Sequence, residues 1–282
     1  ATTSFAQKKL VVATASIFAD MAQNIAGDQL DVKMVVPIGG DPHIYEPVPQ
    51  DAQLIADADL VLKNGLTFEG WLNELIENSG TSAKVVQITE GIEVISSLTY
   101  ENSDDPHAWM TAKNGLIYIK NIKNALAALD PDNADIYEFN YGIYKQQLED
   151  LDKKILADIQ TIPTERRILI TSHDAFSYLG RKFDIEVRGL QGISTVVEFG
   201  LKDVADIVDF IVERDIKSIF VESTVSDKAM QAVVDGVKEK GGEVRIGGTL
   251  YGDALGDPDA PEGTYLGMLK HNAKTISNGL RN

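Results

Sequence analysis

The sequence predicts an α/β fold of two lobes, each with a mostly parallel four-stranded sheet flanked by helices, joined by one long connecting helix. Short β-branched, apolar runs alternate with longer segments of helical period, which is the pattern of βαβ units. These runs fall in two sets on either side of one long interruption, which itself has a helical pattern. The 282 residues are also enough for about two domains.

The elements follow from this pattern. Strands are expected over Leu10–Ala15, Val32–Ile38, Leu60–Lys63 and Lys84–Ile88 in the first half, and over Arg167–Thr171, Ile185–Arg188, Ser218–Glu222 and Val244–Ile246 in the second. Helices are expected between them, for example over Phe68–Asn78, Asp203–Arg214 and Lys228–Lys240. A segment rich in Gly, Asp and Pro, Gly252–Gly263, predicts a loop before a closing helix over Thr264–Leu280.

The long interruption predicts the connecting helix. Asp130 as N-cap before Pro131 is a start signal, and Pro163 stops the run. Apolar residues recur between them mostly every three to five positions, which predicts one buried face: Ile136, Phe139, Ile143, Leu148, Leu151, Ile155 and Ile159. Such a helix would be about 40 Å long and would hold two lobes at a nearly fixed angle, although a long helix within one domain is an alternative. We therefore expect an N-terminal lobe over 1–130, the connecting helix over 131–162 and a C-terminal lobe over 163–282.

Composition narrows the possible functions. The chain has 26 Lys and Arg against 43 Asp and Glu, a formal net charge of −17. A protein this acidic repels phosphate backbones and attracts cations, so nucleic acid is not an expected partner. There is no cysteine, which excludes thiolate metal sites, cysteine nucleophiles and disulfides. The N-terminal residues carry no apolar signal core, which fits a mature exported protein as well as a processed cytosolic one.

Histidines are the candidate ligands, and there are four. His43 and His107 both end an Asp-Pro-His tripeptide, and a rare residue seldom repeats in one context by chance. His173 directly follows a predicted strand. Ligands of open parallel sheets bind beyond the carboxyl ends of the strands, and His43 and His173 lie at or near such ends in different lobes, so we expect these two histidines to face one cleft. His271 lies inside the closing helix, where a structural or solvent-facing role is expected.

Three histidines leave room for one carboxylate, because a transition-metal site needs about four donors. Imidazole with carboxylate suits Zn²⁺, and Mn²⁺ tolerates a shell richer in oxygen. Asp253 follows the last predicted strand, although spacing alone does not separate it from Asp257. Asp41, Asp105 and Asp174 each stand near a candidate ligand and could accept the second imidazole N–H.

Ordered motifs run through nearly the whole chain. They are Gly40-Asp41-Pro42-His43 with Tyr45-Glu46-Pro47, Ala58-Asp59-Leu60-Val61 with Asn64-Gly65-Leu66, Asp105-Pro106-His107-Ala108-Trp109, Thr171-Ser172-His173-Asp174-Ala175-Phe176, Gly189-Leu190-Gln191-Gly192, Phe220-Val221-Glu222-Ser223 and Gly247-Gly248-Thr249-Leu250-Tyr251-Gly252-Asp253-Ala254. Together and in order, these motifs resemble the TroA-like zinc and manganese group of solute-binding proteins of ATP-binding-cassette (ABC) importers.

The resemblance implies one Zn²⁺ or Mn²⁺ ion per chain, held between the lobes as transported ligand. Carried over residue by residue, its ligands are His43 and His107 from the first lobe and His173 and Asp253 from the second. Manganese-preferring relatives commonly have Glu at the third position, so His173 favours zinc or a dual role. The resemblance also implies a monomeric, non-enzymatic protein, periplasmic or on the cell surface, that delivers the ion to an ABC permease. The His-rich loop of zinc importers has no counterpart in the short segment Ser96–Asp105.

Two other function classes fit the sequence less well. A zinc-dependent hydrolase would use three protein ligands and a water, with Glu222 at a strand end as the best candidate base. It is disfavoured because the sequence has no His-Glu-x-x-His run and no second cluster for a two-metal site. A nucleotide-binding or redox protein is disfavoured because the glycine-rich phosphate-binding loops are missing.

Overall fold

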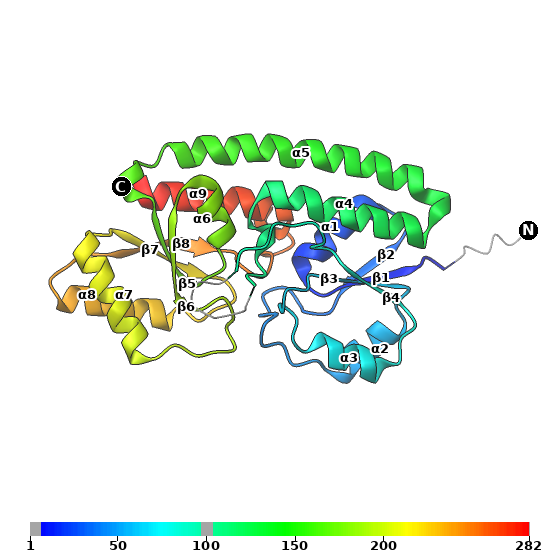
Figure 1. The fold of residues 1–282 in the computed structure, drawn as a ribbon, viewed down its shortest axis with the longest axis horizontal. Coiled ribbons are helices and arrows are strands. Elements are labelled where there is room, and N and C mark those ends of the chain that lie inside the picture. The colour runs from blue at the N-terminus through cyan, green and yellow to red at the C-terminus, as the bar shows by residue number, and fades with distance from the viewer. Residues whose placement is uncertain (1–6, 97–103, 282) are drawn as a thin grey trace, which may run out of the picture.

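The structure, a computed structural model, describes residues 7–96 and 104–281. Two lobes lie side by side beneath one long helix (Figure 1). Most of the short segment between Ser96 and Asp105, which lacks histidine, falls outside the described residues. Among the described residues, no helix has the length and apolar character needed to span a membrane.

The N-terminal lobe contains a four-stranded parallel sheet in the order β2-β1-β3-β4. Its strands are β1 (Leu10–Ala13), β2 (Asp31–Met34), β3 (Leu60–Lys63) and β4 (Lys84–Gln87), and its helices are α1 (Ser16–Ala26), α2 (Pro49–Ala56), α3 (Leu72–Ser79) and α4 (Ala112–Leu129). β2 ends before Pro37, earlier than the sequence predicts, because proline has no N–H to donate to a ladder. The chain that follows it is therefore a loop, residues 35–48, free to carry His43 away from the sheet.

The C-terminal lobe also has four parallel strands. They form two hydrogen-bonded pairs, β5 (Ile168–His173) with β6 (Glu186–Gln191) and β7 (Ser218–Glu222) with β8 (Arg245–Leu250), and β5 lies beside β7. The helices are α6 (Ser177–Phe183), α7 (Leu201–Arg214), α8 (Lys228–Glu239) and α9 (Tyr265–Arg281). The predicted fold class is confirmed, with the second set of strands divided into pairs.

The long helix α5 (Ala134–Gln160) follows a short 3₁₀ turn, η2 (Pro131–Asn133), and runs above both lobes (Figure 1). Its second half buries the predicted apolar residues, from Leu148 to Ile159. The expected face is wrong in the first half, where Phe139 is 68% exposed and Tyr137 and Tyr144 are buried instead. A tyrosine can be buried when its hydroxyl is paired, and that of Tyr137 donates to Asp130 Oδ2 at 2.6 Å.

Three hydrophobic cores organise the molecule. The largest joins α1, α4, α5 and α9 with buried residues of both lobes, including Trp109, Leu169 and Phe220, and we call it the shared core. A second core lies within the C-terminal lobe around α7 and α8, and a third within the N-terminal lobe around α2 and α3. The two lobes are therefore packed against each other beneath α5, and a hinge motion would have to disrupt the shared core.

Candidate metal centre

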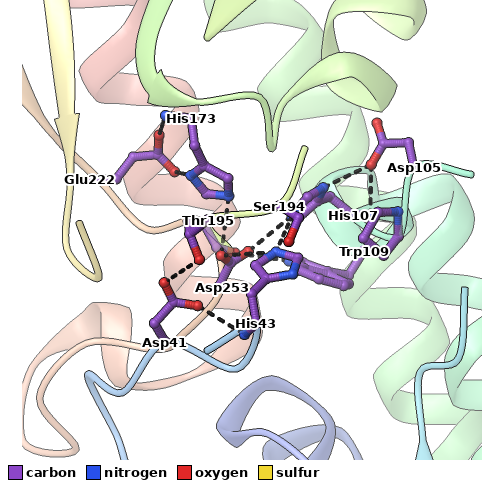
Figure 2. A network of polar contacts seen from close by, with 12 residues as sticks. Asp41, His43, Asp105, His107, Trp109, His173, Ser194, Thr195, Glu222 and Asp253 are labelled. Atoms are coloured by element: carbon purple, nitrogen blue, oxygen red, sulfur yellow. Dashed lines mark hydrogen bonds and ion pairs between the residues drawn. The ribbon is translucent and has the colours of Figure 1, made fainter. Parts of the chain in front are cut away.

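Four segments bring their candidate ligands to one point between the lobes. His43 lies in the loop after β2, and His107 directly precedes the 3₁₀ turn η1 (Ala108–Met110). His173 is the last residue of β5, and Asp253 lies in the loop after β8. One ligand atom from each of the four lies within 4.8 Å of all the others. Figure 2 shows the three imidazole rings gathered around the Asp253 carboxylate.

The distances in this cluster match the dimensions of a bound metal ion. His107 Nε2 lies 3.2 Å from His43 Nε2 and 3.3 Å from Asp253 Oδ1. Asp253 Oδ2 lies 3.1 Å from His173 Nε2 and 3.6 Å from His43 Nε2. Tetrahedral zinc with bonds of about 2.0–2.1 Å keeps its ligand atoms about 3.3 Å apart. These donors could therefore take up such an ion with small adjustments.

Burying the Asp253 carboxylate costs free energy unless positive charge lies beside it. Asp253 is fully buried, and neither of its oxygens accepts a hydrogen bond from the described residues. His173 Nε2 also has no hydrogen-bond partner there. A buried carboxylate is stabilised by positive charge or by hydrogen bonds, and here only the imidazoles or a bound cation can supply either.

Asp105 orients the ring of His107. Its Oδ1 lies 2.8 Å from His107 Nδ1 and also accepts the backbone N–H of His107 at 2.9 Å. An N–H at Nδ1 leaves the lone pair of Nε2 directed at the cluster, the tautomer that a metal requires. The sequence-based expectation for Asp105 agrees with this geometry.

Glu222, rather than Asp174, has the corresponding place beside His173. Glu222 Oε1 accepts the backbone N–H of His173 at 2.8 Å, and Oε2 lies 2.8 Å from His173 Nδ1. Asp174 instead accepts the hydroxyl of Ser177. The sequence placed Glu222 at the end of a predicted strand and His173 just after another, but it did not show that these two strands are neighbours. Gly252 is required nearby, since a Cβ there would lie 2.5 Å from Glu222 Oε2.

His43 is held differently. Asp41 Oδ1 accepts its backbone N–H at 2.9 Å, so Asp41 positions the main chain of His43 and does not take the imidazole N–H that the sequence suggested. The ring packs edge-on against Phe68, with the centroids 4.9 Å apart. Phe68 belongs to the shared core, and its contact with His43 limits the rotation of the ring.

The three histidines of the cluster differ in pKa because their charged neighbours differ. Burial lowers the pKa of His43 to about 3. Burial also opposes the charge of His107, but Asp253 and Asp105 outweigh it and raise its pKa to about 9. Glu222 and Asp253 likewise outweigh burial and raise the pKa of His173 well above its ordinary value. Although burial acts to raise it, the pKa of Asp253 is lowered well below its usual range by His173 and His107. The acids around the cluster thus favour the charged forms of His107 and His173, and a bound cation would supply the same positive charge.

The remaining candidates lie outside the cluster. His271 Nε2 is 3.0 Å from the carbonyl oxygen of Thr249, and its ring packs edge-on against Tyr251. Asp257 is exposed, whereas Asp253 is buried. Burial, which spacing does not reveal, separates these two aspartates.

Known proteins are similar to this chain in sequence and fold. Residues 11–279 match the protein family described as zinc-uptake complex component A, periplasmic. The manganese-binding lipoprotein MntA of Bacillus subtilis is 39% identical over 277 residues, covering 98% of this chain and 90% of that protein. The zinc-binding protein TroA of Treponema pallidum is 38% identical over 270 residues, covering 95% and 88%. The solved structure of TroA from Treponema pallidum superimposes with a TM-score of 0.94 at 37% identity, covering 98% of this chain and all of that one.

Proposed function

Because this chain belongs to the family of periplasmic zinc-uptake components, we propose that it is the solute-binding protein of an ABC importer, which captures one Zn²⁺ or Mn²⁺ ion and delivers it to a membrane permease. One observation carries the proposal. Three imidazole nitrogens converge on the buried carboxylate of Asp253, whose oxygens have no polar partner other than these histidines among the described residues. A divalent cation satisfies all of these groups at once.

We assign the ligands as His43, His107, His173 and Asp253. Three neutral imidazoles and one carboxylate would leave a bound dication with a net charge of +1. Asp105 and Glu222 lie against the outer nitrogens of two of these rings and supply further negative charge. The site as a whole therefore favours a dication over water or a monovalent cation.

The chemistry of the donors favours zinc over manganese. Imidazole nitrogen suits Zn²⁺, and at a given site of nitrogen and oxygen donors Zn²⁺ binds more tightly than Mn²⁺. Both oxygens of Asp253 face histidine nitrogens, so the carboxylate could bind through one or both of them. We therefore propose that zinc is the tighter ligand in vitro. Relatives named for zinc and for manganese are about equally similar to this chain, so we propose either ion as the one transported.

Two features support transport rather than catalysis. A catalytic zinc keeps one position open for water, whereas four protein donors surround this site. Glu222, the base that a hydrolase would need, lies beside the outer nitrogen of His173 and accepts its backbone N–H. We therefore propose a binding protein without enzymatic activity.

The remaining assignments follow from this role. The protein would act outside the cytoplasm, in the periplasm or at the cell surface, as a monomer with the permease and the metal ion as partners and without nucleic acid. Residues 1–130 and 163–282 would be its two lobes, with 131–162 as the connecting segment.

Calorimetric titration of the metal-stripped protein tests the proposal. We expect one tight Zn²⁺ site per chain, which is lost in Asp253→Ala and retained in His271→Ala, the matched control outside the cluster. A ligand that binds only the folded state stabilises it by about 4 kcal/mol at a thousandfold excess over its Kd, so the thermal unfolding temperature should rise with zinc. Failure of the wild-type protein to bind either Zn²⁺ or Mn²⁺ would overturn the proposal.

A further inference from the structure

The four residues of the metal centre are not equally enclosed. His107, His173 and Asp253 have no exposed surface, whereas His43 is 7% exposed. His43 is therefore the only one of these four residues that reaches the surface of the protein, with 2% of its side chain exposed. The loop that carries His43 packs through Tyr45 against the core of the N-terminal lobe, and only the ring of His43 itself contacts the shared core, at Phe68.

The other three residues belong to one buried unit that joins both lobes. Trp109, two residues after His107, donates from Nε1 to the carbonyl oxygen of Gly252, next to Asp253, at 3.0 Å. The hydroxyl of Tyr265 in turn donates to the carbonyl oxygen of Trp109 at 2.5 Å. These contacts lie in or beside the shared core, so His107 and Asp253 can move apart only if this core is disrupted, and Ala175, two residues after His173, is buried in the same core.

The loop of His43 reaches the C-terminal lobe in another way. Apart from His43 itself, residues 35–48 make one hydrogen bond to that lobe within the described parts of the chain, from Thr195 Oγ1 to Asp41 Oδ2 at 2.6 Å. The other oxygen of the same carboxylate accepts the backbone N–H of His43. Asp41 thus bridges the opposite lobe and the main chain of a ligand (Figure 2).

Thr195, at the C-terminal-lobe end of this bridge, is connected to His173, a second proposed ligand. Thr195 lies in the loop after β6, and the side-chain amide of Gln191 donates to the carbonyl oxygens of Thr195 and Val197 at 2.9 and 2.7 Å. Gln191 pairs with His173 in the ladder between β5 and β6. A continuous path therefore connects His173 to His43 around the rim of the site, through Gln191, Thr195 and Asp41.

We propose that Thr195 and Asp41 form a latch across the rim of the metal centre, and that the ion enters and leaves on the His43 side when this latch opens. The inference rests on the proposed function and adds to it the residues that set how long the ion stays. Neither residue touches the ion, so both are positioning residues. Opening the latch breaks the hydrogen bond that ties residues 35–48 to the C-terminal lobe, while the contacts of this loop with its own lobe and the shared core stay intact.

The rate of zinc dissociation tests the latch. Full-length protein loaded with one Zn²⁺ is mixed with excess EDTA in a stopped-flow instrument, and the association rate is measured separately with a zinc-sensitive dye. Because hydrogen bonds to charged groups are among the stronger ones, Thr195→Val should release zinc about tenfold faster. Association should be no slower, since the latch obstructs entry as well. Thr195→Ser, which keeps the hydroxyl, should resemble the wild type, as should Thr249→Val at an exposed position on β8.

A double-mutant cycle separates the latch from a general effect on the loop. Thr195→Val should accelerate release no further in the Asp41→Ala background, because its partner is already gone. An unchanged release rate in Thr195→Val, an equal acceleration in both backgrounds, or slower association would each overturn the latch. Tight zinc binding with any of these results contradicts the latch alone, whereas a wild-type protein that takes up no zinc contradicts the proposed function.

Discussion

Replacing Glu222 with Gln tests how the outer carboxylate prepares His173 for metal binding. One oxygen of Glu222 accepts the backbone N–H of His173, and the other lies 2.8 Å from its Nδ1. A carboxylate at this position favours the proton on Nδ1 and leaves the Nε2 lone pair facing the cluster. Glutamine has one acceptor and one donor. With its oxygen on the backbone N–H, its amino group faces Nδ1 and favours the tautomer protonated at Nε2, which cannot bind a metal.

The expected change in zinc affinity comes from the typical effect of removing a group that hydrogen-bonds to a metal-binding histidine. Such a removal typically weakens metal binding by about 10- to 100-fold, or about 1.4–2.7 kcal/mol, so the zinc Kd of Glu222→Gln should rise by this factor. Competition against a chromophoric chelator measures it. Asp174→Asn is the matched control, because Asp174 adjoins His173 in sequence but pairs with Ser177, and its Kd should not change. Equal Kd values for Glu222→Gln and the wild type, or a larger loss in Asp174→Asn, would refute the reasoning.

Three further predictions concern selectivity, protons and motion. His173→Glu should lower the preference for Zn²⁺ over Mn²⁺ by about tenfold in competition titrations, because it replaces imidazole with a harder oxygen ligand; an unchanged ratio would place His173 away from the ion. Zinc binding at pH 7 should release about two protons, from His107, whose pKa is raised to about 9, and from His173, whose pKa is raised well above its ordinary value, while His43 with its pKa lowered to about 3 releases none. Affinity should therefore rise with pH up to about pH 9, and calorimetry in buffers of different ionisation enthalpy counts the protons, with a count of zero as the contradicting result. Since both lobes contribute to the shared core, the radius of gyration from small-angle scattering should stay the same on zinc binding; a large decrease would contradict this rigidity.

The sequence predicted the framework of the fold because its signals are local. Strands such as Leu60–Lys63 and Ser218–Glu222 are short β-branched or apolar runs whose bounds agree with the structure. The first half of α5 was predicted less well, because the pattern treated Phe139 as buried and gave no weight to Tyr137. Whether a tyrosine is buried depends on a partner for its hydroxyl, here Asp130, and helical period alone does not supply that information.

For the candidate metal centre too, some residues could be predicted from local sequence and others could not. The repeated Asp-Pro-His tripeptides marked His43 and His107, since the signal lies in the chain itself. The choice of Asp253 over Asp257 came from family resemblance, and burial distinguishes the two in the structure. The contact between Glu222 and His173 depends on β5 lying beside β7, a tertiary arrangement that no local pattern reports.

The central claim is that three imidazoles and one carboxylate, drawn from both lobes, hold a single divalent ion. Anomalous diffraction from crystals grown with Zn²⁺, recorded on both sides of the zinc edge, tests it most directly. The account predicts one strong peak per chain, about 2.0–2.2 Å from the Nε2 atoms of His43, His107 and His173 and from an oxygen of Asp253. A principal peak elsewhere on the chain, or one that any of these four residues does not touch, would contradict it.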